Sequence, residues 1–456
     1  MINHLLKFLK DRYDEKRPVL LAFSGGPDSL ALLHLLIEFQ KKHPLKFAIA
    51  HVDHGWRKES REEALSIAQM AKKLEIQAHF QTLNPKELKG NLEAACREER
   101  LRFFSSLCRD FGYQAVLLAH HADDVAETVL KRAFEGTSLP YLNALKSELS
   151  IHGMQVWRPL LPVSKRHIIE WLDQRKLKGF SDSTNQDTKF LRAKLRLQLL
   201  PYLSEMFGKE VSSSLCKIAE EAAELKDYLD DRISPYLARM IKGKMGNFLD
   251  LSLDCPQTLL ELKHLIRCFC SLSSSFALSR ESLNRAAECL REKAANKTFE
   301  VGKKAAVNLE TAVQDNKVMQ ILHIDRGCLL VPFLSLPPPP TTQLKLQSAD
   351  PVKFGSWEIQ EIPNSLSKEP SNWKDLWCQG KGEVVLPRGN YVLAAPHAEA
   401  VKWWAAHKVK VPAFLRSQIP ILLENGRLKH EFLTGSYHPS SKLISGDLQK
   451  FEIRIL

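Results

Sequence analysis

The sequence predicts an α/β protein whose N-terminal part is a doubly wound parallel sheet. Three apolar runs, at residues 19–23, 47–50 and 115–119, each lead into a polar turn and then into a segment with helical spacing. A continuous apolar run is typical of a parallel strand that is buried on both faces. Strands that alternate with helices in this way indicate a sheet with helices on both of its faces.

The elements of this first domain, residues 1–210, follow from the same patterns. Apolar runs predict strands near residues 18–23, 46–51, 76–82 and 115–119. Helical spacing between them predicts helices near residues 29–41, 59–74, 92–111 and 124–134. Because ligands bind at the carboxyl edge of such a sheet, the polar turns after the strands are expected to share one site.

The remaining chain is expected to form two further domains. Apolar residues at spacings of three and four predict a helix from about residue 211 to 242, which begins a helical linker and middle domain over residues 211–335. The prolines Pro337–Pro340 exclude a helix and indicate a stiff spacer. Short apolar runs separated by turns then predict a smaller, mixed α/β domain over residues 341–456.

The composition narrows the class of protein. A chain of 456 residues is too long for one ordinary domain, and its 44% apolar residues can supply two or three cores. No run of about 18 apolar residues occurs and the first ten residues lack a signal-peptide pattern, so we expect a soluble, cytoplasmic protein without a membrane partner. Nine cysteines without a Cys-x-x-Cys pair exclude a plainly encoded zinc ribbon or iron–sulfur site.

The charge of the chain favours an anionic partner. The net charge is +12, although many basic proteins bind no anion. Residues 158–196 contain ten lysines and arginines against four aspartates and glutamates, a segment along which an RNA backbone would bind in a salt-sensitive way. Near the C-terminus, Trp403 and Trp404 lie among basic residues from Lys402 to Arg416, a pattern equally compatible with stacking on bases and with core packing.

The sequence Ser-Gly-Gly-Pro-Asp-Ser at residues 24–29 indicates a phosphate-binding turn between a strand and a helix. Gly25 and Gly26 can adopt backbone angles that bring main-chain N–H groups close to a phosphate. A helix that begins near Pro27 directs its positive end to the same place. Ser24 and Ser29 add hydroxyl donors.

Asp28 lies inside this turn and would repel a phosphate unless a divalent cation lay between them. The carboxylate therefore implies Mg²⁺. The turn is not a Walker A loop, because no Gly-Lys-Ser/Thr follows at the required spacing. Ser-Gly-Gly turns also occur in ordinary surface loops, but the flanking strand and helix and the internal aspartate favour phosphate binding.

A second polar turn follows the apolar run 115–119. His120, Asp124 and Glu127 are spaced four and three residues apart, so a helix that begins here places them on one face. Two carboxylates and an imidazole at the end of a strand make a pocket for a metal or a cationic ligand. The acidic residues also suit a helix N-terminus. That second explanation does not account for the histidine pair, His120 and His121.

Two further motifs complete the set. His-Val-Asp-His-Gly-Trp-Arg, residues 51–57, follows an apolar run, and Glu-x-x-x-Arg-x-x-Arg, residues 93–100, opens a predicted helix. In this order and spacing the four motifs closely resemble those of the tRNA(Ile)-lysidine synthetases, a family of PP-loop ATP pyrophosphatases with a HUP-like sheet. The resemblance is strong over about residues 17–203, and for the C-terminal part it implies appended domains that help to recognise tRNA.

The resemblance implies an activity and its partners. Such enzymes use ATP and Mg²⁺ to adenylate the wobble cytidine in the CAU anticodon of a minor isoleucine tRNA, and L-lysine then displaces AMP to give lysidine. A homodimer is compatible with the resemblance. The implied catalytic residues are Asp28 (also the Mg²⁺ ligand), His120, Asp124 and Glu127. The implied ATP-binding residues are Ser24, Gly25, Gly26, Pro27, Asp28 and Ser29. The implied contacts to substrate or tRNA are His54, Arg57, Arg97, Arg192 and Arg196.

Two departures from the family pattern and two alternative functions stay open. Ala193 stands where the family usually has Asn, and Glu135 where it usually has Arg. A PP-loop tRNA thiolase would share the ATP loop, but the thiolases used for comparison carry paired catalytic or cluster-binding cysteines, which this chain lacks. A non-catalytic RNA-binding protein on the same fold would not need Asp28, Asp124 and Glu127 together. The division of acid, base and lysine-binding roles among His120, Asp124 and Glu127 also stays open.

Overall fold

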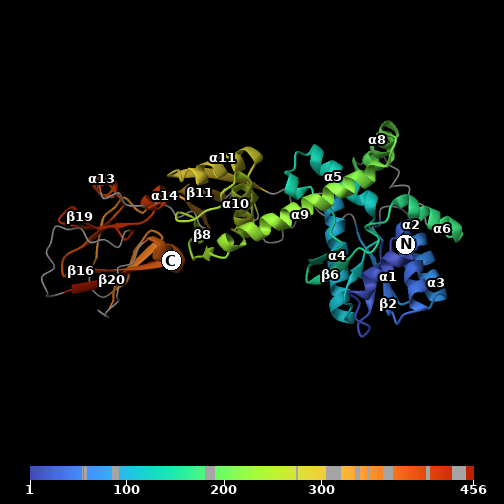
Figure 1. Cartoon of the computed structure of the whole chain (residues 1–456). Coiled ribbons are helices and arrows are strands. Elements are labelled where there is room, and N and C mark those ends of the chain that lie inside the picture. Colours follow the sequence, from blue (N-terminus) through green and yellow to red (C-terminus); the bar gives the residue numbers. More distant parts are fainter. Residues whose placement is uncertain are drawn as a thin grey trace. The chain divides into compact units, whose positions relative to one another are not determined.

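A six-stranded sheet lies at the centre of the first of two units, residues 1–227 and 228–456, in this computed structural model (Figure 1). The structure describes residues 1–53, 55, 59–84, 92–179, 191–273, 276–303, 320–333, 339–346, 350–362, 373–406, 411–433 and 448–456. The boundary between the units falls within α9 (Val211–Leu237). The first domain was predicted to end at residue 210, whereas the first unit ends at residue 227. The division of the chain into three domains stays a prediction.

The sheet of the first unit has the strand order β3-β2-β1-β4-β6-β5. Its strands are β1 (Val19–Ala22), β2 (Phe47–Asp53), β3 (Ala78–Thr82), β4 (Val116–Leu117), β5 (Glu148–Ile151) and β6 (Met154–Trp157). Neighbouring strands are parallel except for the edge pair β5–β6. In register, Leu21 lies opposite Ile49 and Leu117. The predicted parallel sheet is confirmed, and the hairpin β5–β6 extends it.

Helices cover both faces of this sheet. Their bounds are α1 (Ile2–Lys10), α2 (Pro27–Gln40), α3 (Glu59–Lys73), α4 (Leu92–Phe111), α5 (Ala122–Phe134), α6 (Lys165–Gln174), α7 (Leu191–Lys194) and α8 (Leu200–Phe207). Successive residues of a strand point to opposite faces. Leu21 accordingly packs with residues of α1, α2, α3 and α6, whereas Leu20 packs with Phe104 and Leu107 of α4. Both leucines of β1 are fully buried, which confirms the doubly wound arrangement.

Helix α5, which carries the predicted acidic face, is held by the segment that leads into α9. Val129 packs in one apolar cluster with Leu200 and Leu215, from α8 and α9. Between α7 and α8 the helix widens into one π-helical stretch, Leu195–Leu199, which carries Arg196. Such π-helical turns are frequent at functional sites. The departure Ala193 is buried in α7, and Glu135 follows the end of α5.

The second unit begins with a six-stranded antiparallel sheet of order β7-β8-β12-β11-β10-β9. Its strands are β7 (Ile241–Lys242), β8 (Gly246–Asp250), β9 (Phe276–Ala277), β10 (Lys297–Lys303), β11 (Gln320–Asp325) and β12 (Cys328–Pro332). Two helices, α10 (Leu259–Ser273) and α11 (Arg280–Arg291), pack on it through Phe269 and Leu290. The helical character predicted for residues 211–335 is present in α9, α10 and α11, although α9 ends at Leu237 and not near residue 242. The sheet was missed, because strands such as β10 mix charged and apolar residues.

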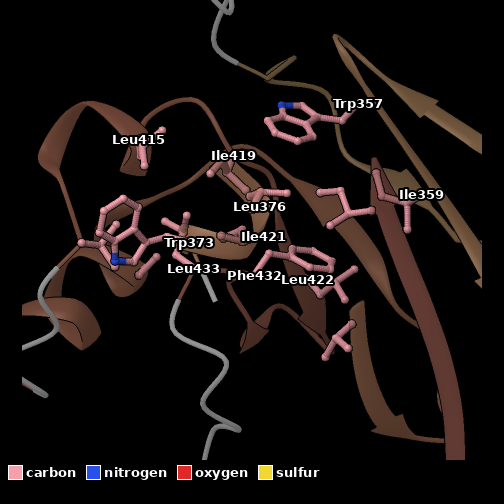
Figure 2. Packing of buried hydrophobic residues seen from close by; sticks show 14 of the residues in the cluster. Trp357, Ile359, Trp373, Leu376, Leu415, Ile419, Ile421, Leu422, Phe432 and Leu433 are labelled. Atoms are coloured by element: carbon pink, nitrogen blue, oxygen red, sulfur yellow. The ribbon is translucent and has the colours of Figure 1, made fainter. Parts of the chain in front are cut away.

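The rest of the second unit holds two four-stranded sheets, of order β13-β17-β18-β19 and β14-β15-β20-β16. Their strands are β13 (Leu344–Lys345), β14 (Val352–Phe354), β15 (Trp357–Ile362), β16 (Lys381–Pro387), β17 (Val392–Ala394), β18 (Ile421–Glu424), β19 (Arg427–His430) and β20 (Leu448–Ile455). The helices are α12 (Trp373–Gln379), α13 (Ala398–Ala406) and α14 (Ala413–Arg416). Figure 2 shows their shared core, in which Trp357, Trp373 and Phe432 are buried.

The tryptophan pair of α13 belongs to this core. Trp403 is 7% exposed and Trp404 is 1% exposed, and the Trp404 indole Nε1 donates a hydrogen bond to Glu431 at 3.1 Å. Core packing is therefore the correct interpretation of the pair, and stacking on bases is wrong. The basic residues at 407–410 lie outside the described residues. Across the part of the chain that the structure describes, no helix combines the length and the apolar character needed to cross a membrane.

Candidate active site

The predicted phosphate loop, Ser24–Ser29, lies at the carboxyl end of β1, and α2 begins within it at Pro27. Gly25 has a φ of +83°, a backbone angle that favours glycine. The Ser29 hydroxyl lies 3.0 Å from the Gly26 carbonyl oxygen and 3.2 Å from the Ser24 hydroxyl, so the loop is braced from inside. The N-terminus of a 14-residue helix and the N–H groups of the turn together form an anion site.

Two contacts from other segments fix this loop from outside. The His51 ring, at the end of β2, places Nδ1 2.9 Å from the carbonyl oxygen of Phe23, just before the loop. A Cβ atom at Gly179 would lie only 2.9 Å from the backbone nitrogen of Pro27, so the chain at Gly179 passes directly against the loop. The position of Gly179 was not predicted, because the contact joins segments far apart in the sequence.

Asp28 is paired with a cation of the chain. Lys165 Nζ, at the start of α6, lies 2.5 Å from Asp28 Oδ1, and the Lys165 backbone N–H donates to Asp123 Oδ2 at 2.7 Å. Burial opposes ionisation of Asp28, but the hydrogen bonds and charges of His121 and Lys165 outweigh it and lower its pKa. An ionised carboxylate in a phosphate loop is the oxygen donor that Mg²⁺ prefers, so the site fits this ion. Lys165 was missed as a site residue, although it lies in the basic segment 158–196.

His121 lies between three carboxylates. Its side chain is 2% exposed, and its ring nitrogens lie 3.7 Å from Asp28, 3.5 Å from Asp123 and 3.5 Å from Asp124. Burial alone would lower the pKa of His121, but the carboxylates raise it to about 9. The same pairing lowers the pKa of Asp123 to about 2, against the effect of its burial. His121 is therefore an imidazolium whose charge holds the three carboxylates together. The sequence indicated the position of this histidine but not its role.

The neighbouring His120 differs from His121 in its protonation state. Burial and the nearby cations Arg158 and Arg100 lower the pKa of His120 to about 4, although Asp124 raises it, so the ring is neutral at pH 7. Arg158 Nε donates to His120 Nδ1 at 3.0 Å. Because arginine has no acceptor, Nδ1 is the accepting nitrogen and Nε2 carries the proton. His120 thus presents an N–H donor, whereas sequence reasoning also considered it as a proton acceptor.

Asp124 and Glu127 share a face of α5, as predicted, and they hold a cation. Arg196 Nε lies 2.6 Å from Glu127 Oε1, and Arg196 Nη2 lies 3.0 Å from Asp124 Oδ1. The second oxygen of Asp124 accepts the His121 backbone N–H at 2.9 Å, so the helix-cap explanation also applies to this residue. Burial raises the pKa of Glu127 more than Arg196 lowers it. The pair thus binds a cation, which in this structure is Arg196 of the chain itself.

Arginines gather beside His120. The pKa of Arg100 is lowered by burial and by the charges of Arg97 and Arg192, and that of Arg158 by burial and by Arg97. Such mutual repulsion is relieved by an anion. Arg97 and Arg192 were predicted, whereas Arg158 and Arg100 were not, although Arg100 lies in the motif at residues 93–100. His54 and Arg57, predicted as contacts, lie outside the described residues.

Comparisons with known proteins agree with this geometry. The PP-loop domain family matches residues 1–203. The chain is 35% identical to a tRNA(Ile)-lysidine synthase of Protochlamydia amoebophila, over 95% of this chain and 93% of that protein. It is 39% identical to a tRNA(Ile)-lysidine synthase of Chlamydia muridarum, over 56% of this chain and 79% of that protein.

A solved structure of the U34-tRNA thiolase NcsA from Methanococcus maripaludis, with its [4Fe-4S] cluster, matches 50% of this chain and 77% of that chain. Its TM-score is 0.41 and its identity 16%, a likeness on which no argument rests. The relative from Protochlamydia amoebophila, by contrast, covers both units of the chain. The phosphate loop and the histidine and carboxylate pairs lie at one edge of the sheet, and the 35% identity covers nearly the full length of both proteins. We conclude that the chain belongs to the tRNA(Ile)-lysidine synthase family.

Proposed function

We propose that this chain joins L-lysine to the 2-carbon of the wobble cytidine in the CAU anticodon of a minor isoleucine tRNA, in an ATP-dependent reaction. An adenylated cytidine is the intermediate, and the products are lysidine, AMP and pyrophosphate. The observation that carries the proposal is one series of charged contacts from the phosphate loop to the cation pocket. It runs through Lys165, Asp28, His121, Asp124, Arg196 and Glu127.

The first half of the reaction needs the phosphate loop. A cytosine 2-oxygen is a poor leaving group, and transfer of AMP to it makes a good one. Negative charge then develops on pyrophosphate, where the N–H groups of the loop and the Lys165 ammonium would stabilise it. Asp28 would hold Mg²⁺, which when bound neutralises phosphate charge. The Nε2–H of His120 would donate a hydrogen bond to an oxygen of the substrate.

The second half needs a cation pocket and a proton acceptor. Lysine attacks through its ε-amine as a free base, so a nearby group must take the proton. Glu127 suits this role because its pKa is raised, which brings it closer to the pH at which the reaction runs. Asp124 is held in place because it accepts a hydrogen bond from the backbone N–H of His121. It therefore suits binding of the α-ammonium group of lysine. Arg196 would then move toward an anionic group, such as the lysine carboxylate.

The arginines beside His120 would meet the RNA. Positive charge is concentrated in this part of the first unit by four arginines, Arg97, Arg100, Arg158 and Arg192. Phosphate contacts position an RNA without reading its sequence. The choice of an isoleucine tRNA, action in the cytoplasm and a homodimeric state belong to this proposal as expectations of the family.

Incubation with ATP, radiolabelled lysine and bulk tRNA tests the proposal. We expect label to become acid-precipitable only when ATP is present, with AMP released in equal amount. A non-catalytic RNA-binding protein would retain tRNA without releasing AMP, and a thiolase would leave lysine unincorporated. The thiolase alternative is not favoured, since the relative that matches across both units is named a tRNA(Ile)-lysidine synthase.

A further inference from the structure

Three side chains of different chemistry meet between α9 and α10 in the second unit. Asp230 comes from α9, and His264 and Cys268 lie one turn apart on α10. His264 Nε2 lies 2.7 Å from Asp230 Oδ1 and 3.8 Å from Cys268 Sγ. The three potential ligand atoms all lie within 4.8 Å of one another. No residue of the proposed active site takes part.

We propose that Asp230, His264 and Cys268 form a binding site for Zn²⁺. A thiolate, an imidazole nitrogen and a carboxylate oxygen are the three donor types that zinc combines, whereas Mg²⁺ and Ca²⁺ take oxygen donors. Zinc prefers four tetrahedral ligands, and water would supply the fourth. The Asp230 side chain is 41% exposed, so solvent reaches the edge of the cluster, while the His264 side chain is 2% exposed and fixed in place.

The observed spacing is close to what such a site needs. Tetrahedral bonds of about 2.0–2.3 Å separate neighbouring ligand atoms by about 3.3–3.6 Å. The His264–Cys268 separation of 3.8 Å must close slightly, and the His264–Asp230 separation of 2.7 Å must open by about half an ångström. The half-exposed Asp230 side chain can make that second movement, because it is the least enclosed of the three.

Metal binding would change the protonation of Cys268 and His264. It would also tighten the packing of α9 on α10. The Cys268 thiol loses its proton to solvent, and His264 coordinates as the neutral tautomer that carries its proton on Nδ1. Zinc affinity should therefore rise with pH. A hydrogen-bonded trio without a metal function is the competing explanation, since Asp230 and His264 already form such a bond.

Variants separate the two explanations. Cys268→Ser removes the thiolate, and Asp230→Asn keeps a hydrogen-bond acceptor for His264 but weakens the ligand. Cys289→Ser, which removes a thiol of α11 outside the cluster, is the matched control. The full chain is stripped with a chelator, and binding of Zn²⁺ alone is measured by competition with a chromophoric chelator. Co²⁺ is then added to look for a thiolate-to-cobalt charge-transfer band.

We expect one Zn²⁺ per chain, with the charge-transfer band present in the wild type and in Cys289→Ser. Both features should be lost in Cys268→Ser, and stoichiometric binding should be lost in Asp230→Asn although the variant stays folded by circular dichroism. Absence of stoichiometric binding in the wild type would overturn the proposal. Unchanged binding in Cys268→Ser would overturn it as well, because the metal would then be held elsewhere.

Discussion

Arg196 Nε lies 2.6 Å from Glu127 Oε1, so the carboxylate pair for which the sequence predicted a metal or a cationic ligand already binds a cation of the chain. This contact gives the pocket a defined charge preference without a substrate. In the proposed mechanism, Arg196 must leave Glu127 before the ε-amine of lysine can approach that carboxylate.

Asp28→Asn should lower AMP release by at least about a hundredfold, because it removes the anionic ligand from the phosphate loop. Retention of tRNA on a filter should stay close to that of the wild type. Asp173→Asn, an exposed aspartate of α6, is the matched control and should keep full turnover. Normal turnover in Asp28→Asn would refute its role as the metal ligand.

Glu127→Gln and Asp124→Asn should separate the two roles of the cation pocket. Loss of the proton acceptor in Glu127→Gln should slow lysine transfer by about 10²–10⁴-fold while adenylated tRNA accumulates. Asp124→Asn should instead raise the lysine concentration needed for half-maximal rate. Both are measured by single-turnover assays with labelled ATP and labelled lysine. If both variants lose adenylation and keep their lysine dependence, the pocket serves the metal and the assignment to lysine is wrong.

His121 should stabilise the first unit in a pH-dependent way. Its folded-state pKa of about 9 exceeds the usual 6.5, so its contribution is fully present below about pH 6.5 and is lost as the pH rises through 9. A rise from 6.5 to about 9 corresponds to about 3 kcal/mol of stabilisation. The free energy of unfolding should therefore differ between wild type and His121→Gln at pH 6.5 and converge above pH 9, measured in urea with hydrogen exchange of α5 as the reporter. A difference that does not change with pH would contradict the imidazolium.

Arg97→Gln should weaken tRNA binding and reduce its salt dependence. Each phosphate contact that is lost lowers the slope of log K against log salt concentration by roughly one. Arg109→Gln removes an arginine of the same helix that is 75% exposed, and serves as the matched control. Equal slopes for Arg97→Gln, Arg109→Gln and the wild type would show that Arg97 does not contact phosphate.

The sequence predicted those parts of the site that are local along the chain. The loop Ser24–Ser29 was predictable because an apolar strand, a glycine pair and a helix start are consecutive in sequence. The shared face of Asp124 and Glu127 was predictable because helical spacing alone determines it. Lys165 was not, because it reaches Asp28 across 137 residues and only the packing of α6 on α2 brings them together.

The charge states of the histidine pair were equally beyond sequence reasoning. His120 and His121 are identical side chains next to each other, and only their surroundings distinguish them. Three carboxylates surround one ring, and an arginine faces the other. In the second unit, the tryptophan pair of α13 was ambiguous for the same reason, since burial is a property of the fold and not of a local pattern.

The identity of the product nucleoside decides whether this chain makes lysidine. Bulk tRNA is incubated with the protein, ATP and lysine, then digested to nucleosides and analysed by mass spectrometry, with reactions lacking ATP and reactions with Asp28→Asn as controls. The account predicts a cytidine whose mass has increased by that of lysine less one water, formed only in the complete reaction with the wild type. Unmodified cytidine in the complete reaction, or the same product without ATP, would contradict it.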